Sequence, residues 1–390
     1  MVVHAYYPAS ETRVERQARA LVARGFEVDV ICLRNQGEPA MESDGGIAIY
    51  RLPVQRHKKR SVVLQLFEYL VFFALAFVRL TVLHWQRRYS VVQVHNLPDF
   101  LIFAALAPKL MGASLILDLH DLMPEFYAAR FDSDIASWAV RLVAWQESLS
   151  CRFADHVITV TELWQQTLIK RGLPPEKVSV VMNVADDRVF QPAAKDGERV
   201  VRGDDRFHLI YHGNLTQRYG LDLVIQAVDR VRREIPQIHL TIHGGGDYRQ
   251  LLLELVNELD LGNHVSFSAR FVPTSKLPEF ISQADVGIVP YRQDVFTDGI
   301  LPTKLMEYVA LGIPVIAART SAIAAYFDET MIQFFTPDDP DDLARCIQML
   351  YADPERLAQL ARNAELFNQR YNWMNLSAEY VALVERIGGQ

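Results

Sequence analysis

The sequence is poor in cysteine, and its few cysteines do not form a recognisable site. Cys32, Cys151 and Cys346 are far apart and odd in number in a chain of 390 residues. Because there is no CxxC pair and no His/Cys cluster, neither a disulfide framework nor a zinc site is predicted. This pattern is typical of a reducing compartment, and we expect the cytoplasm.

Several motifs that would indicate one particular chemistry are also missing. There is no GxxxxGK[ST] loop, no HExxH, and no GxGxxG that follows a predicted strand. HGGG at 243–246 resembles the oxyanion loop of α/β-hydrolases, but the chain has no GxSxG nucleophile elbow. The formal net charge of −7 shows no basic excess, so no nucleic-acid partner is predicted.

The acidic clusters do not predict a metal site. DSD at 132–134 has the spacing of a metal-binding DxD, but Asp134 directly precedes a helical pattern, where aspartate is a favoured N-cap. DDPDD at 338–342 is interpreted as a turn and an N-cap before Leu343. We therefore expect no bound metal.

The chain does contain an alternation of short apolar runs and amphipathic helical stretches, which is typical of parallel α/β sheets. Residues 1–8 are interpreted as a first strand, because they lack a basic start and a small-residue cleavage site. Further predicted strands begin at Val28, Val91, Ser114, His156 and Val178, and then at Phe207, Ile238, Val265, Asp285, Pro314 and Ile332.

A polar stretch, QPAAKDGERVVRGDD at 191–205, separates the two halves of this pattern. It contains glycine and proline and has no hydrophobic periodicity, so it predicts a domain boundary. We expect residues 1–190 and 205–373 to form two doubly wound domains, with the helix at 374–390 crossing back to the first. In such sheets, ligands bind at the carboxyl ends of the strands.

One predicted helix, at residues 62–83, is apolar enough to concern a membrane. It is flanked by RHKKR at 56–60 and HWQRR at 84–88. About 20 apolar residues span a bilayer, but Glu68 and Arg79 interrupt this segment, and each costs ~2.5–3.5 kcal/mol near the midplane. A buried core helix, a helix in the membrane interface and a true span are the alternatives. The basic flanks favour the interface.

The segment most informative about chemistry is DGILPTKLMEYVALGIPVIAA at 298–318. A loop with Asp298 and Gly299 leads into a predicted helix that carries Lys304 and Glu307. The N–H groups and the dipole at a helix start favour an anion, and Lys304 adds a charge suited to a diphosphate. Glu307 offers a carboxylate to a vicinal diol such as a ribose. The alternative for these two residues is a surface ion pair.

In the first half, polar residues follow two predicted strands. His95 and Asn96 end VVQVHN, and His120 and Asp121 end SLILDLHD. All four should emerge at the carboxyl edge of the sheet. His120 could instead be a core-edge histidine, and Asp121 could either orient His120 or cap the next helix.

The block at 298–318 resembles the donor-site signature of family-four retaining glycosyltransferases, especially the bacterial branch that builds surface polysaccharides on lipid carriers. Other segments agree with this family in order along nearly the whole chain. They are RVERQARALVARGFEVDVIC (13–32), LDLHDLMPE (117–125), ADHVITVTE (154–162), VVMNVADDRVF (180–190), YHGNLTQRYGLDLVIQAV (211–228), HGGG (243–246), ARFVP (269–273), LPEFISQADVGIVPY (277–291) and NQRYNW (368–373). Their number and order make the resemblance specific.

The resemblance implies a GT-B fold, in which two Rossmann-like domains face a cleft, and a metal-independent transfer of a sugar with retained configuration. No cofactor is expected beyond a nucleoside diphosphate sugar as co-substrate. The acceptor would be a polyprenyl-diphosphate-linked sugar, at the cytoplasmic face of the plasma membrane. The implied catalytic residues are His120, Arg218, Lys304 and Glu307. The implied donor-binding residues are Gly213, Asn214, His243, Gly244, Gly245, Phe271, Asp298, Gly299 and Thr303, and the acceptor-side residues are Arg13, His95, Asn96 and Asp121.

The sequence departs from the family pattern at the phosphate and sugar contacts. Gly299 stands where the family commonly has the first of two glutamates, so recognition of the donor sugar should differ. Asn214 and Tyr219 stand at the usual basic positions, and we expect Arg218 and Lys304 to share the diphosphate instead. PASETRVERQ replaces the glycine-rich loop after the first strand, where Arg13 is the cation best placed to reach the cleft.

Two other functions remain open at this stage. A GT-B nucleotide-sugar epimerase or a phosphorylase would keep the fold, although an epimerase needs further acid/base carboxylates and a phosphorylase a longer chain. A sugar-binding scaffold without activity is the other alternative, for which Gly299 is the argument. For the glycines at 244 and 245, a plain turn is the alternative to close approach of a ligand.

Overall fold

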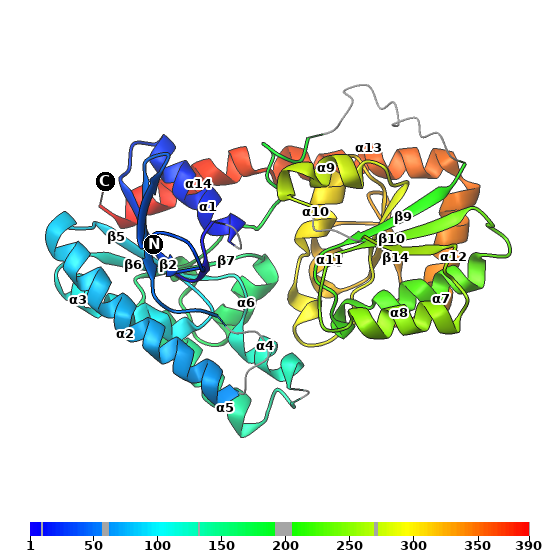
Figure 1. The fold of residues 1–390 in the computed structure, drawn as a ribbon. Coiled ribbons are helices and arrows are strands. Elements are labelled where there is room, and N and C mark those ends of the chain that lie inside the picture. Colours follow the sequence, from blue (N-terminus) through cyan, green and yellow to red (C-terminus); the bar gives the residue numbers. More distant parts are fainter. Residues whose placement is uncertain (9–10, 57–61, 132, 192–204, 269–271, 390) are drawn as a thin grey trace. The chain divides into compact units, whose positions relative to one another are not determined.

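The computed structural model describes residues 1–8, 11–56, 62–131, 133–191, 205–268 and 272–389. Within them the chain forms two compact units, residues 1–183 with 375–390, and residues 184–374. Each unit contains a largely or wholly parallel sheet, so the predicted α/β class is confirmed (Figure 1). The boundary predicted at 191–205 lies almost entirely outside the described residues.

The first unit contains an eight-stranded sheet, counted over the described residues, in the order β3-β4-β2-β1-β5-β6-β7-β8. Its strands are β1 (Val2–Tyr6), β2 (Val28–Leu33), β3 (Met41–Asp44), β4 (Ile47–Leu52), β5 (Val91–His95), β6 (Ser114–Leu119), β7 (His156–Thr159) and β8 (Val178–Val180). Its helices are α1 (Thr12–Ala23), α2 (Val62–Arg87), η1 (Asp99–Ala105), α3 (Leu106–Leu110), α4 (Met123–Arg130), α5 (Trp138–Phe153), α6 (Glu162–Lys170), η2 (Pro175–Lys177) and α14 (Trp373–Ile387).

The β3–β4 hairpin at the edge of this sheet was not predicted from the sequence. β3 pairs antiparallel to β4, and Gly45 and Gly46 form the turn with φ of 54° and 88°. Three of the four β3 residues are exposed, so this strand lacks an apolar run. β4 has such a run and is mostly buried, but it was also not predicted. The Gly-Gly turn is a usual hairpin signal, and it could have predicted this element.

The apolar helix α2 lies along the outside of the first unit (Figure 1). Its inner side chains Phe72, Ala76, Leu80 and Leu83 are buried, and the helix packs against β1, β4 and η1. An 18-residue stretch of α2 is long and apolar enough to cross a membrane, and only 22% of that stretch is buried inside the protein. The reading of α2 as a core helix buried on all sides is therefore wrong.

The second unit contains a six-stranded parallel sheet within the described residues, in the order β11-β10-β9-β12-β13-β14. Its strands are β9 (Phe207–His212), β10 (Ile238–His243), β11 (Val265–Phe267), β12 (Val286–Val289), β13 (Val315–Ala318) and β14 (Gln333–Phe335). Its helices are η3 (Gln217–Tyr219), α7 (Leu221–Val231), α8 (Arg249–Glu258), η4 (Thr274–Lys276), α9 (Leu277–Ile281), η5 (Thr297–Gly299), α10 (Thr303–Ala310), α11 (Ser321–Tyr326), α12 (Pro340–Ala352) and α13 (Pro354–Arg370).

The core of the second unit forms where α7, α8, α12 and α13 pack on the apolar strands. Val224, Val228 and Val231 of α7 are fully buried in it, as their helical spacing predicts. At one helix start the expected cap is confirmed, because the Asp339 carboxylate accepts from the N–H groups of Asp341 and Asp342.

At another helix start the expected cap is wrong. Ser137, not Asp134, is the N-cap of α5, and Asp134 accepts a hydrogen bond from Ala136 N within the preceding turn. Asp132, the other aspartate of the DxD, lies outside the described residues.

Candidate functional site

The strand order of the second sheet reverses between β9 and β12, and this is where a doubly wound sheet binds its ligands. β9 is followed outward by β10 and β11, and β12 by β13 and β14. The residues that end β9 and β12 therefore border a crevice at the carboxyl edge. Helix α10, which packs against β12 and β13, begins beside it.

Lys304 of α10 lies in a cage of three tyrosines at this edge. Its Nζ is 5.0 Å from the ring centroids of Tyr211 and Tyr219, and 4.7 Å from that of Tyr291. It also donates a 2.8 Å hydrogen bond to the Tyr291 hydroxyl. The rings of Tyr219 and Tyr291 stack with their centroids 4.5 Å apart. Lys304 is therefore not part of an exposed ion pair, and that alternative is wrong.

Among the residues that the structure describes, no carboxylate forms an ion pair with the ammonium group in this cage. Burial lowers the pKa of Lys304 to about 8, against a smaller opposing effect of the Glu307 carboxylate. Three aromatic faces attract the cation, but they do not neutralise it. A bound diphosphate would supply the missing negative charge.

Two further features around Lys304 suit an anion. Helix α10 starts after Pro302, which occupies the N-cap position, and no side chain caps its first N–H groups. Arg218 of η3 lies with its guanidinium carbon 5.6 Å from the Phe296 ring centroid, and its Nη1 is buried without a hydrogen-bond partner among the described residues. These donors fit the phosphate-binding role predicted for Arg218 and Lys304.

Glu307 faces into the sheet edge rather than toward Lys304. Its Oε2 accepts a 2.5 Å hydrogen bond from His212 Nε2 at the end of β9. His212 Nδ1 lies 3.0 Å from the Tyr308 hydroxyl, which also donates toward Ile210 O. The carboxylate is thus held in place through one oxygen. The ribose role of Glu307 stays a prediction.

The predicted donor-loop glycines separate into two kinds. A side chain at Gly244, where φ is 140°, would place its Cβ 1.8 Å from Gly213 O, so this glycine is needed for packing between two backbone segments. A Cβ on Gly213 would lie 3.2 Å from Lys304 Cε. At Gly245 the Cβ would meet nothing within 4 Å, so this position stays open to a ligand. Backbone packing therefore explains Gly244, while for Gly245 a plain turn and the approach of a ligand both stay open.

The remaining predicted donor-side residues make different kinds of contact. The His243 ring is buried, its Nδ1 lies 2.6 Å from Ser268 Oγ, and burial lowers its pKa. Asp298 accepts hydrogen bonds from Ser321 N and Gln293, so its carboxylate caps α11. Gly299 is buried in η5, whereas Asn214 and Thr303 are exposed. Phe271 lies outside the described residues.

His120 follows β6 at the carboxyl edge of the first sheet, as predicted. Its backbone N–H donates to Asn96 Oδ1, and its Nδ1 is buried without a hydrogen-bond partner in the described part of the chain. Burial lowers the pKa of His120 to about 4, although Asp118 opposes this. The ring is therefore neutral near pH 7 and can donate or accept a hydrogen bond.

Arg13 does not reach out from this edge, and that expectation is wrong. Its guanidinium is buried, lies 2.9 Å from Asp118 Oδ1, and donates to Val181 O. Burial opposes ionisation of Asp118, but the Arg13 charge and the neighbouring His95 ring hold the pKa of Asp118 well below its usual range. His95 is itself fully buried against Asp118 at 3.2 Å. Arg13 and His95 are therefore buried next to Asp118 and stabilise the carboxyl edge of the sheet from inside the core.

Asn96 and Asp121 contact each other where β5 and β6 end. Asn96 is buried, and its amide donates to Asp99 Oδ1 and to Asp121 O, which ties the ends of β5 and β6 together. Leu122, one residue after Asp121, holds the N-cap position of α4. That Asp121 orients His120 or caps this helix stays a prediction.

His95, Asp118 and His120 form a group whose potential metal-ligand atoms lie within 4.8 Å of one another. The Asp118 carboxylate, however, already accepts hydrogen bonds from Arg13, Gln17 and Gln93. A cation would compete with the buried Arg13 charge for the same oxygens. The donor set therefore does not favour a metal.

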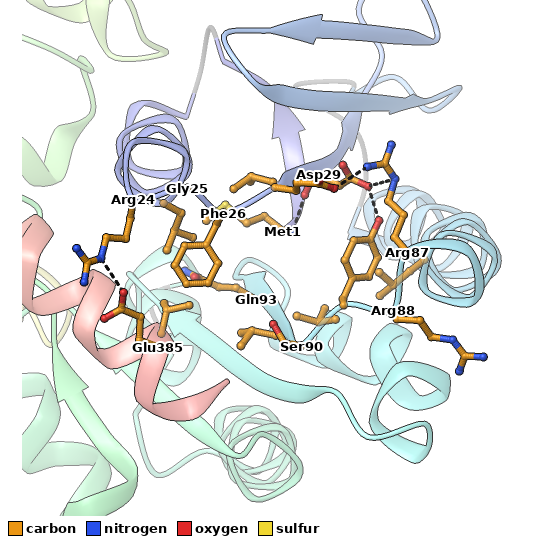
Figure 2. Close-up of a pocket in the computed structure, with 18 of the residues that line it drawn as sticks. Met1, Arg24, Gly25, Phe26, Asp29, Arg87, Arg88, Ser90, Gln93 and Glu385 are labelled. Atoms are coloured by element: carbon orange, nitrogen blue, oxygen red, sulfur yellow. Dashed lines mark hydrogen bonds and ion pairs between the residues drawn. The ribbon is translucent and has the colours of Figure 1, made fainter. Parts of the chain in front are cut away.

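A cavity of about 360 Å³ in the first unit is lined by Gln93, which contacts Asp118, but not by His95, Asp118 or His120. Its lining includes Val28 and Val91, the first residues of β2 and β5, so it opens at the amino edge of the sheet (Figure 2). At its rim Asp29 lies 3.2 Å from Arg87 Nε and accepts a hydrogen bond from the Tyr89 hydroxyl. These contacts fix the end of α2 and are not part of the candidate site.

Sequence reasoning gave no role to Tyr211, Tyr291 and His212, and it named Tyr219 only as a departure from a basic position of the family. Tyr211 and His212 end β9. Tyr291 follows β12 after one intervening residue, Pro290. The predicted strand ends were a usable signal, because residues there face the crevice in a parallel sheet. The site residues were assigned by their match to the family's motifs, so the tyrosines at the same edge were given no role in binding.

Two family models match the chain. Residues 9–183 match the model described as a glycosyl transferase 4-like domain, and residues 195–367 match the one described as glycosyl transferases group 1.

Curated relatives are glycosyltransferases. The chain is 32% identical over 162 residues to a GDP-mannose-dependent alpha-(1-6)-phosphatidylinositol monomannoside mannosyltransferase of Mycolicibacterium smegmatis, covering 40% of this chain and 41% of that protein. It is 26% identical over 244 residues to the putative colanic acid biosynthesis glycosyltransferase WcaL of Escherichia coli, covering 60% and 58%. In four such relatives the matched part is 41% to 58% of their own length.

The fold is similar to that of Anabaena HepE, solved in complex with UDP-glucose. The TM-score is 0.73 at 17% identity, and the match covers 99% of both chains.

Proposed function

The chain belongs to the group 1, family-four type glycosyltransferases with the GT-B fold, and we propose that it moves a sugar from a nucleoside diphosphate to a lipid-linked acceptor with retained configuration. The observation that carries the proposal is the buried Lys304, which lies in a tyrosine cage and forms no ion pair with any described residue, beside the start of α10, where Pro302 at the N-cap has no capping side chain. The UDP-glucose bound by HepE supports a nucleotide-sugar donor.

In the proposed reaction, negative charge develops on the departing nucleoside diphosphate. Lys304, Arg218 and the first N–H groups of α10 stabilise it, and groups placed in advance around a developing charge give the largest catalytic effect. His120, which is neutral at pH 7, positions a sugar hydroxyl. Following the family description, the departing phosphate helps to deprotonate the acceptor on the same face, so no carboxylate nucleophile is needed.

The donor and the stereochemistry can be tested together. Purified protein is incubated with UDP- and GDP-sugars, with and without a polyprenyl-diphosphate-linked sugar, and the anomeric configuration of the product is read by NMR. Acceptor-dependent release of nucleoside diphosphate with retention supports the proposal. Inversion, or interconversion of the donor sugar without transfer, refutes it, and the second result would indicate an epimerase. Donor binding without turnover would indicate a scaffold.

We also propose that the transfer needs no divalent metal. Support comes from the Asp118 carboxylate, whose hydrogen bonds to Arg13 and its neighbours leave it poorly suited to a cation. Activity should persist in excess chelator. Loss of activity that magnesium or manganese restores would refute this part.

The lipid-linked acceptor is supported by helix α2. Its charged residues turn toward the protein: Glu68 lies 3.3 Å from His4, Arg79 lies 4.6 Å from the Tyr50 ring, and Arg87 lies 3.2 Å from Asp29. The outward side instead exposes the apolar residues Val63, Leu64, Leu66, Phe67, Leu70, Val78, Val82 and Trp85. An amphipathic helix of this kind suits the plane of a membrane surface.

The contribution of the basic flank to membrane binding can be measured by flotation. The chain is mixed with anionic vesicles and compared with a variant in which Arg56, Lys58, Lys59 and Arg60 are neutralised; residues 57–61 lie outside the described residues. Each basic residue near an anionic surface contributes ~1 kcal/mol, so the variant should float less and salt should weaken binding. Equal flotation of both proteins would remove the basic flank from the proposal.

We place this activity at the cytoplasmic face of the plasma membrane. Cys32, Cys151 and Cys346 are all free and buried, which supports a reducing compartment. Fractionation of cells should recover the protein with inner membranes at low salt. Recovery from an oxidising compartment would contradict the assignment.

A further inference from the structure

The exposed tryptophans of the chain are concentrated on two helices of the first unit. Of the five tryptophans, Trp164 and Trp373 are buried, whereas Trp85 of α2 is 69% exposed, and Trp138 and Trp145 of α5 are 80% and 60% exposed. Tryptophan has an apolar body and a polar N–H, and it is enriched where protein meets a membrane surface. Sequence reasoning singled out α2 but not α5.

The exposed residues of α5 form one stripe. Trp138, Leu142, Trp145 and Leu149 are exposed at a spacing of four, three and four residues, which places them on one side of a helix. The opposite side is buried through Val140, Ser150 and Cys151. No described part of the chain therefore covers the stripe, although an amphipathic helix normally turns its apolar side inward.

Helices α2 and α5 cover the same face of the first sheet. The strands β5, β6 and β7 follow one another to one side of β1. Because crossovers between parallel strands are right-handed, the segments that lead to them share one face, and these segments contain α2, then η1 with α3, then α5. Figure 1 shows α2, α3 and α5 below the sheet of the first unit and α1 with α14 above it.

Aromatic contacts join the two helices through η1. The Phe73 ring of α2 lies 6.1 Å from that of Phe100, and the Phe103 ring lies 4.9 Å from that of Phe153 in α5. The short helix α3, which packs on α2, adds exposed Leu106 and Leu110. An apolar surface therefore extends from α2 across η1 and α3 to α5.

The charges on this surface fit an anionic bilayer. Glu68 is the only acidic residue in α2 and faces His4, and Glu147 is the only one in α5 and is buried. Arg141 and Arg152 are exposed on α5. They lie three and seven residues after Trp138 and Trp145, on the flank of the same stripe. Asp134 and Asp155 are exposed before and after α5, but neither lies in the stripe, and Asp155 is paired with Lys109. Acidic lipid headgroups favour a stripe that has no exposed carboxylate and is flanked by arginines, whereas a protein partner has no such requirement.

We propose that α5 is a second membrane-contact helix, and that Trp138 and Trp145 anchor the first unit to an anionic bilayer together with α2. The inference rests on the proposed membrane function of α2 and extends it. Two parallel contact lines fix the tilt of the first unit on the membrane, which one helix alone does not. The carboxyl edge with His120 is thereby held at a constant angle to the lipid surface.

The test uses tryptophan fluorescence of the full chain on vesicles of phosphatidylcholine and phosphatidylglycerol with brominated acyl chains. Trp85→Phe leaves Trp138 and Trp145 as the exposed reporters, and Trp138→Phe/Trp145→Phe leaves Trp85, while Trp164 and Trp373 give a buried background. We expect quenching in both variants. Quenching of Trp85 alone would overturn the role of α5 and keep that of α2. Absence of quenching in both would overturn both proposals.

A second measurement weighs the contribution of α5. Replacement of both its exposed tryptophans, as Trp138→Ala/Trp145→Ala, should lower the vesicle partition coefficient about tenfold or more, because two large apolar side chains no longer enter the interface. Leu251→Ala/Leu366→Ala is the matched control, since these side chains of the second unit are 56% and 57% exposed. An equal loss in the control, or none in either, would overturn the proposal. Both variants change exposed residues, so circular dichroism should show unchanged folding.

Discussion

Replacing Lys304 by methionine should make the free protein more stable while removing most of its activity. Methionine has a similar shape and no charge. The fall in the pKa of Lys304 from 10.5 to about 8 corresponds to an unfavourable free energy of ~3 kcal/mol at pH 7, at ~1.4 kcal/mol per pKa unit. Attraction to the tyrosine faces offsets ~0.5–2 kcal/mol of this. The expected net gain for Lys304→Met is therefore ~1–2 kcal/mol.

The gain should depend on pH in a defined direction. Below pH 8 the lysine is charged in both the folded and the unfolded chain, and burial opposes folding in full. Between pH 8 and 10.5 the folded protein has lost the proton that the unfolded chain still holds. The stability of the wild type should therefore rise with pH through this window relative to Lys304→Met, and the difference from this source should vanish above it.

The assay is urea unfolding without nucleotide at pH 7 and at pH 9.5, combined with donor turnover. Turnover of Lys304→Met should fall ~10²-fold or more, because the charge on the leaving group loses its nearest partner. Lys276→Met, which changes an exposed lysine of the same unit, should leave both quantities nearly unchanged. A variant that is less stable than the wild type at pH 7 and retains its turnover would refute the reasoning.

Three further outcomes are expected. Gly244→Ala should destabilise the second unit by more than ~2 kcal/mol in urea unfolding, because its Cβ would lie 1.8 Å from Gly213 O, whereas Gly245→Ala, which meets nothing within 4 Å, should change little. Arg218→Ala should lower donor turnover ~10²-fold, and Arg218→Lys should restore only part of it, since lysine lacks the planar fork; full activity of both would remove Arg218 from the site. Because burial lowers the pKa of His120 to about 4, its titration should not shape the pH–rate profile between pH 6 and 8, and an inflection there that His120→Gln abolishes would contradict this.

The fold was predictable because its strands are buried on both faces and are therefore continuous apolar runs. VDVICL and SLILDL coincide with β2 and β6 residue by residue. The edge strand β3 escaped because an exposed edge carries no such run. The cap of α5 was misplaced for a related reason, since Ser137 and Asp134 are both good N-caps and only the three-dimensional turn decides between them.

The candidate site was predictable in position but not in contacts. The carboxyl ends of strands follow from the strand pattern, so Lys304 and His120 were found. The partners of Lys304 come from three separate segments, and no local pattern states that Tyr211, Tyr219 and Tyr291 meet around one ammonium group. Arg13 was misjudged in the same way, because its partner Asp118 is 105 residues away in the sequence.

The burial of one side of α2 in the core bears on how the protein is distributed in a cell. Phe72, Ala76, Leu80 and Leu83 belong to the core of the first unit, so α2 cannot enter the bilayer without unfolding part of that core. The attachment that we propose through its outer side is therefore reversible, and we expect the protein to partition between a dissolved pool and a membrane pool. The share in each pool should then follow the supply of acidic lipid and the ionic strength, without any change in the amount of protein.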